Sequence, residues 1–292
     1  FRPLDIGRLQ RRGEFDIPER SFVRRLLDTW VTLRESYKFL YNASHPIAAP
    51  SDVDTDKPVA TDDEGFIRHI FPADVSKRMR QSARQQGVSL NDLALRDLFL
   101  VIRDWNRRLE NDYAHGRLRI NVPISLRTRD DRAMPATNVM SFAFLTRNVS
   151  ACDAPDELLR SIREETKLTV RDRYSLYFLG ALAAADSFGI LRRSLRGNRC
   201  LSTAVLTNMG DPTRRFVAQL PRRGGLVVAG NLTLTNNSGV PPMRPLTRAV
   251  FGIGNYGREI IICLRCDPRS FSPADTQRLL DQYASQLAKS AE

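Results

Sequence analysis

The clearest hydrophobic pattern in the chain runs from Arg248 to Asp267 and predicts two adjacent strands. The first contains Val250, Phe251 and Ile253, and a turn is expected at residues 254–257. In the second, apolar side chains fill both alternating sets of positions, with Ile260, Ile262, Leu264 and Cys266 on one side and Ile261 and Cys263 on the other. A strand that is apolar on both faces is usually covered on both. We therefore expect a hairpin at the centre of a sheet, with helices packed against it.

The rest of the chain alternates between helical and strand periodicities. Apolar residues at helical spacing predict helices at residues 21–43, 72–86, 89–109, 155–173, 175–193 and from Ser272 onward. Short apolar runs predict strands at residues 65–71, 117–126, 138–146, 201–208 and 225–235. Helices interleaved with strands, followed by several strands close together, favour an α/β (α+β) two-layer sandwich in which a mixed sheet has helical cover.

Residues that favour helix ends accompany these helices. Ser272 is a suitable N-cap, with Pro273 at the first helical position and Asp275 at the third. Asp153 is a suitable cap for the helix at 155–173, and Gly87 suits the end of the helix at 72–86.

Composition divides the chain into two parts. Residues 1–65 are expected to be a connector helix and an acidic linker, because residues 51–65 hold six acidic side chains and one lysine. Residues 66–292 are expected to form one domain. The first residue is Phe1 and not methionine, so we expect the chain to belong to something longer. Residues 1–50 would then pack mainly on whatever precedes Phe1.

Bulk properties exclude several classes of protein. A hydrophobic fraction of 42% with 16 glycines and 16 prolines fits a globular protein. No apolar run is long enough to span a membrane, and no signal segment opens the chain. The four cysteines are too scattered for a disulfide scaffold. Cys263 and Cys266 have CxxC spacing but would face opposite sides of a strand, so a redox or zinc role is not expected. With so few cysteines, a reducing cytoplasm is the default expectation.

The net charge of +12 suggests an anionic partner. Residues 190–225 contain eight arginines and one aspartate, while the remainder is mildly basic and mixed in sign. No zinc-finger, RNP or basic coiled-coil motif accompanies this cluster. A nucleic-acid partner, an acidic protein domain, the phosphates of a small ligand and a solvated face all stay open.

Motifs of self-sufficient catalysis are absent from the sequence. It contains no P-loop, GxGxxG or GxSxG motif. His45, His69 and His115 lie far apart and lack metal-ligand spacing, so no metal site is expected.

Several segments, taken in order, resemble a known family. They are residues 122–127 (VPISLR), Asn138-Val139, residues 206–211 (LTNMGD), the loop at 241–247 (PPMRPLT) and residues 251–268 (FGIGNYGREIIICLRCDP). Together they are similar to the C-terminal lobe of the CoA-dependent acyltransferase superfamily over about residues 66–290. That superfamily includes chloramphenicol acetyltransferase, peptide-synthetase condensation domains, alcohol acyltransferases and wax ester synthases.

The resemblance implies two similar lobes with a tunnel between them. Family members carry HHxxxDG in the first lobe, and its second histidine takes the proton from a hydroxyl or amine that attacks a thioester. This sequence has no HHxxxDG. Either the motif lies upstream of residue 1, which would make the first lobe a missing partner, or the protein is a non-catalytic binding or scaffold relative. The implied substrates are a CoA or phosphopantetheine thioester, or an acyl carrier protein, and a small-molecule acceptor, with no permanently bound cofactor.

The resemblance also suggests site residues. Arg127 is the candidate for the arginine that pairs with the aspartate of HHxxxDG, although a surface arginine at a strand end is an equal alternative. The LTNMGD segment resembles the wax ester synthase NVPGP stretch, and its Met209 and Asp211 depart from the family pattern. Candidates for the tunnel wall are Asn208, Gly210, Asp211, Asn138 and Tyr256. Candidates for contact with CoA phosphates or a carrier protein are Arg192, Arg193, Arg214 and Arg215.

Overall fold

The structure is a computed structural model, and it describes residues 4–11, 30, 43–50, 65–109, 116–128, 130–135, 137–171, 174–189, 193, 199–244 and 246–292. Three predictions fall outside these residues. They are the helix at 21–43, of which only residues 30 and 43 are described, the acidic stretch at 51–64, and Arg192.

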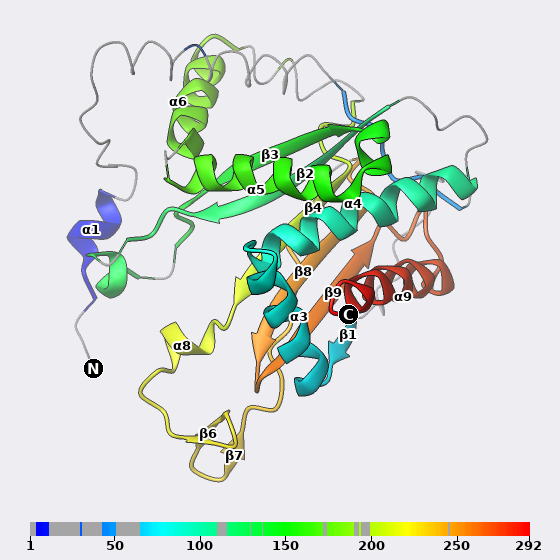
Figure 1. The fold of residues 1–292 in the computed structure, drawn as a ribbon. Coiled ribbons are helices and arrows are strands. Elements are labelled where there is room, and N and C mark those ends of the chain that lie inside the picture. Colours follow the sequence, from blue (N-terminus) through cyan, green and yellow to red (C-terminus); the bar gives the residue numbers. More distant parts are fainter. Residues whose placement is uncertain are drawn as a thin grey trace.

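A six-stranded mixed sheet forms the centre of the described part of the chain (Figure 1). Its strands are β1 (Ile67–Phe71), β2 (Arg117–Ser125), β3 (Met140–Asn148), β4 (Ala204–Gly210), β8 (Ala249–Tyr256) and β9 (Glu259–Cys266). They lie in the order β1-β9-β8-β4-β2-β3. The neighbours β2, β4 and β8 run parallel, while the other pairs are antiparallel. The predicted mixed sheet is confirmed.

The β8–β9 hairpin is interior to this sheet, as its pattern predicts. Its turn lies later than expected, because β8 continues through Tyr256, which pairs with Glu259. Gly257 and Arg258 have φ angles of 57° and 76°. Two successive residues with positive φ suit the tight two-residue turns that match the twist of paired strands.

Helices cover one face of the sheet (Figure 1). They are α3 (Ala73–Gln85), α4 (Leu90–Leu109), α5 (Pro155–Arg171) and α9 (Pro273–Lys289), while α6 (Tyr174–Ser187) packs near β3. The β9 side chains of Ile260, Ile262, Leu264 and Cys266 join the main core beneath these helices. Ile261 and Cys263 belong to a second, smaller core on the other face. The predicted division of β9 side chains between two faces is therefore confirmed.

A small three-stranded sheet and its flanking loops cover part of the second face. Its strands are β5 (Arg222–Arg223), β6 (Leu226–Ala229) and β7 (Leu232–Thr233), and the short helix α8 (Thr213–Phe216) precedes them. The prediction of a single strand at 225–235 is wrong, because the chain reverses between β6 and β7, which pair antiparallel. Gly230 lies in this reversal with a φ of 61°, a conformation that glycine adopts without steric cost.

Residues 43–50 are built into the same body as the sheet. Ile47 is fully buried, and the Arg248 guanidinium donates to its carbonyl at 2.8 Å. The Asn106 side chain exchanges hydrogen bonds with the backbone of Ala48 and Pro46. This part of the expected connector thus packs on the residues that follow it.

Two further segments meet near the end of β2. Helix α1 (Ile6–Gln10) lies close to the short 3-10 helix η1 (Asp130–Ala133), and the backbone N–H of Asp5 donates to Ala133. Arg8 donates to the carboxylate of Asp131 at 2.6 Å. Burial alone would raise the pKa of Asp131, but the Thr128 N–H and the Arg8 guanidinium outweigh it and hold the pKa below its ordinary value.

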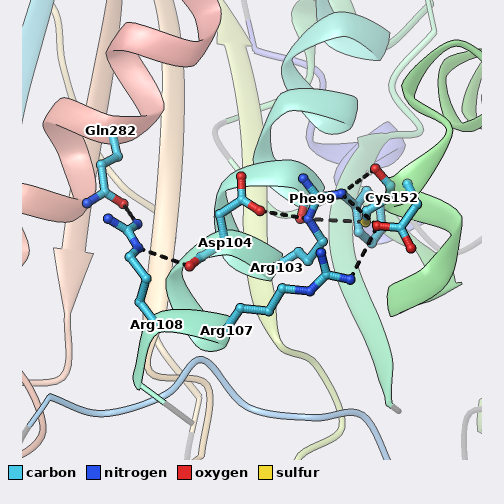
Figure 2. A network of polar contacts seen from close by, with 8 residues as sticks. Phe99, Arg103, Asp104, Arg107, Arg108, Cys152 and Gln282 are labelled. Carbon is cyan, nitrogen blue, oxygen red and sulfur yellow. Dashed lines mark hydrogen bonds and ion pairs between the residues drawn. The ribbon is translucent and has the colours of Figure 1, made fainter. Parts of the chain in front are cut away.

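A polar network fastens α4 to the 3-10 helix η2 (Val149–Asp153) (Figure 2). Arg103 donates to the carbonyl of Cys152, and both Arg103 and Arg107 reach the carboxylate of Asp153. Asp153 therefore faces α4, contrary to its expected role as the cap of α5. The thiol of Cys152 donates to the carbonyl of Phe99, and burial raises its pKa to about 11, so it is not a reactive thiol.

Candidate functional site at the fork of the sheet

The sheet divides between β2 and β4. These parallel strands pair only through Ile120 with Ala204 and Asn121 with Val205. Beyond that point β2 stays paired with β3 as far as Ser125, and β4 stays paired with β8. We call the Asn121–Val205 pair and the two strand ends that diverge from it the fork. The tips of β2 and β4 lie apart in Figure 1.

Five of the ten predicted site residues lie at the edge of the sheet where the fork opens. Arg127 follows β2, and Asn138 precedes β3, whose first residue Met140 pairs with Ser125. Asn208 and Gly210 end β4, and Asp211 follows them. Because β2 and β4 are parallel, their carboxyl ends meet at one edge, which is where open α/β sheets usually bind ligands.

Arg127 ties together the loop that connects β2 and β3. Its Nη2 atom donates to the carbonyls of Pro135 and Thr137, both at 3.0 Å. Its other guanidinium N–H groups donate to no group among the described residues. The side chain is half-buried, so it combines a fixed position with donors that are still available. Pairing with an aspartate of another lobe stays a prediction.

The end of β4 is shaped by a bulge and a local turn. The register of β4 against β8 shifts between Asn208 and Gly210, and Gly210 has a φ of 60°. The amide oxygen of Asn208 accepts from the N–H of Gly210 at 2.9 Å. The carboxylate of Asp211 accepts from the N–H of Thr213 at 3.1 Å and also from the hydroxyl of Thr213. These side chains therefore hold the shape of the turn.

Of the arginines between residues 190 and 225, Arg214 and Arg222 lie near the same carboxylate, that of Asp211. Arg214 reaches the carboxylate of Asp211 at 3.3 Å and is otherwise exposed, and Arg222 lies 3.7 Å from the same carboxylate. Arg193 is exposed, and the side chain of Arg215 is not among those described. Contact with phosphates or with a carrier protein stays a prediction.

Tyr256 serves as an anchor between the sheet and the β6–β7 hairpin. It is 3% exposed, and its hydroxyl donates to the carbonyl of Leu234 at 2.6 Å and accepts from the N–H of Val227 at 2.8 Å. Its polar atom is thus used within the protein. A place in a tunnel wall is a prediction that these contacts do not test.

Two glycines of β8 have a role that the sequence reading missed. A Cβ atom at Gly252 would lie 2.2 Å from the carbonyl oxygen of Gly239, and one at Gly254 would lie 3.5 Å from the carbonyl oxygen of Asn237. The segment at 237–239 therefore lies directly on the second face. The alternation of glycines in FGIGNYG was the signal, because alternate residues share one face of a strand.

Asn121 at the fork was also missed. It is 4% exposed, and its amide oxygen has no hydrogen-bond partner in the described part of the chain. A single asparagine inside the apolar run LRINVPI was the signal, since buried polar groups are usually paired.

The described residues offer no metal site. They contain no group of three or more histidine, cysteine, aspartate or glutamate side chains that could hold a metal ion. Among the helices of the described part, none is long and apolar enough to cross a membrane.

Sequence comparison finds no relative, whereas comparison of folds does. No protein-family model and no curated protein matches the sequence. The cyclization-docking bidomain of a nonribosomal peptide synthetase from Sorangium cellulosum superposes with a TM-score of 0.58 and 15% identity, over 98% of this chain and 51% of that one. Trichothecene 15-O-acetyltransferase from Fusarium sporotrichioides superposes with a TM-score of 0.63 and 10% identity, over 89% and 52%.

A third match is the epimerization domain from the third module of tyrocidine synthetase B. Its TM-score is 0.52 at 12% identity, over 98% of this chain and 63% of that one. The protein thus has the CoA-dependent acyltransferase-like fold that condensation domains and this acetyltransferase share. The chain spans about half the length of the first two structures.

Proposed function

We propose that this chain is the C-terminal lobe of an acyltransferase that moves an acyl group from a CoA or carrier-protein thioester to a hydroxyl or amine. The observation that carries the proposal is that Arg127, Asn138 and Asn208 lie at the same edge of the sheet, in a fold that matches about half of an acetyltransferase and of a cyclization-docking bidomain. The other half would supply the general base.

The proposed reaction is a balanced acyl exchange. The acceptor oxygen or nitrogen attacks the thioester carbonyl carbon, and an imidazole in the other lobe takes the acceptor's proton. The carbon–sulfur bond then breaks, and the proton passes to the departing thiolate. This chain would contribute one wall of the site and a guanidinium that holds the base-bearing loop through its aspartate.

The first test is the complete reading frame. We expect HHxxxDG to be encoded within about 40 residues upstream of Phe1, given usual sizes of helices and connections. Replacing its second histidine with alanine should abolish release of free thiol from an acyl-CoA. Unchanged release would refute this mechanism.

The second test concerns Arg127. In the complete protein, Arg127→Ala should lower kcat by about 100-fold, because a misplaced base loses much of its effect. Arg127→Lys should recover little, since an ammonium cannot replace a planar guanidinium. Arg78→Ala is the control, because Arg78 forms an exposed pair with Asp74 on α3. If Arg127→Ala behaves like the control, Arg127 braces only its own loop.

One observation favours the alternative of a non-catalytic binding or scaffold module. The amide oxygen of Asn208, the carboxylate of Asp211 and the hydroxyl of Tyr256 each form a hydrogen bond within this chain. This alternative predicts no HHxxxDG upstream and no thiol release from any acyl-CoA.

A further inference from the structure

A buried amide oxygen lies at the base of the fork. The side chain of Asn121 is almost fully buried, and among the described residues none donates a hydrogen bond to its Oδ1 atom. Burying an amide group without a partner is costly, and buried polar groups in native proteins are nearly always paired. The Oδ1 atom of Asn121 is therefore free to accept a hydrogen bond from a bound molecule.

The strand geometry fixes the direction in which this amide points. The neighbours Ile120 and Val122 belong to the main core beneath the helices. Since side chains alternate along a strand, Asn121 points to the second face. Its cross-strand neighbours there are Phe144 on β3 and Val205 on β4, and neither side chain can hydrogen-bond to it.

Half-buried side chains follow both strands away from Asn121 on this face. Pro123 and its partner Phe142 lie along the β2–β3 arm, and Thr207 lies along the β4 arm. Met209 follows Thr207, close to Gly239 of the overlying segment. Because these side chains are only half-buried, this mostly apolar lining is partly open to solvent, and Asn121 lies at the end of it where β2 and β4 pair.

We propose that Asn121 recognises a hydrogen-bond donor, a hydroxyl or an amide N–H, on the distal part of the acyl group. The inference rests on the proposed acyl transfer and adds to it the class of acyl group. The apolar lining suits a hydrocarbon chain, and the buried Oδ1 favours a chain that brings a donor to the base of the fork. A plain hydrocarbon chain would leave Oδ1 unpaired.

The experiment compares two matched sets of thioesters on the complete protein. One is a series of straight-chain acyl-CoAs of increasing length, and the other is the same series with a terminal hydroxyl. At one chain length the hydroxyl should raise kcat/KM about tenfold in the native protein, as expected for one hydrogen bond to a buried group. Asn121→Leu, which keeps the shape of the side chain, should abolish this gain. Asn148→Leu, at the exposed end of β3, should keep it.

Stability supplies a readout that is independent of turnover. Asn121→Leu should raise Tm of the free protein, because it removes an unpaired buried amide. If no thioester is turned over, the proposed transfer fails, and thermal stabilisation by the two series then decides the inference. A hydroxyl preference that is lost in Asn121→Leu supports it. Equal shifts, absent shifts, a preference that survives Asn121→Leu, or a lower Tm in that variant would each overturn it.

Discussion

At the scale of single residues, two glycines of β8 leave room for the segment that lies on the second face of the sheet. Gly252 lets the carbonyl of Gly239 approach β8 closely. Gly254, two residues later on the same face, has more room, because its nearest neighbour is the carbonyl of Asn237 at 3.5 Å. The two positions differ in clearance and share the same strand, so they form a matched pair.

Gly252→Ala should therefore destabilise the protein far more than Gly254→Ala. A methyl group at Gly252 would overlap the Gly239 oxygen, and backbone must move to relieve the overlap. We expect a loss of about 3 kcal/mol in the free energy of unfolding for Gly252→Ala, at the upper end of overpacking effects. Urea unfolding of both variants measures this. Similar losses in the two would mean that the 237–239 segment moves away easily.

At the scale of elements, α9 shows how a sequence signal becomes a helix end. Ser272 and Asp275 form a capping box, in which the Ser272 hydroxyl accepts from the Asp275 N–H at 3.1 Å. The hydroxyl of Ser272 also donates to the Asp275 carboxylate at 2.6 Å. This hydrogen bond lowers the pKa of Asp275, with burial opposing and Arg278 assisting.

Asp275→Asn should weaken this helix end in a pH-dependent way. The folded pKa lies below the unfolded value of about 3.9, so the stabilisation is complete above that value and is lost as the pH falls through the folded pKa. We expect a loss of about 1 kcal/mol at pH 7 that shrinks below about pH 3. Thermal unfolding at several pH values measures it. Asp281→Asn, exposed on the same helix, should change little at any pH.

The elements also show what the sequence could and could not predict. The two-faced pattern of β9 and the capping box of α9 are local signals, and both were read correctly. The break between β6 and β7 was missed, because its apolar run is continuous across Gly230. The asparagine inside the β2 segment is visible in the sequence, but its lack of a hydrogen-bond partner is not, since that depends on where β2 leaves β4, a contact between residues far apart in the chain.

At the scale of the whole molecule, hydrogen bonds join residues 43–48 to the part of the chain that begins at residue 66. Trp105 on α4 donates to the carbonyl of Ala48 at 2.9 Å, and Thr203 before β4 donates to the carbonyl of His45 at 2.7 Å. These bonds join residues 43–48 to both the helical layer and the sheet. A boundary at residue 66 would cut through them.

Ile47→Ala tests whether this segment belongs to the core. Ile47 is fully buried, so its truncation should lower the free energy of unfolding by about 3 kcal/mol, as for other buried aliphatic side chains. Ile70→Ala, on the edge strand β1 with 37% of its surface exposed, is the matched control and should cost less than about 1 kcal/mol. Urea unfolding compares the two. If both losses were small, residues 43–50 would be a detachable connector, and the boundary at residue 66 would stand. A large loss for Ile47→Ala alone means that the folded core requires a segment encoded before the acidic stretch. The acidic stretch would then connect two parts of one folded body.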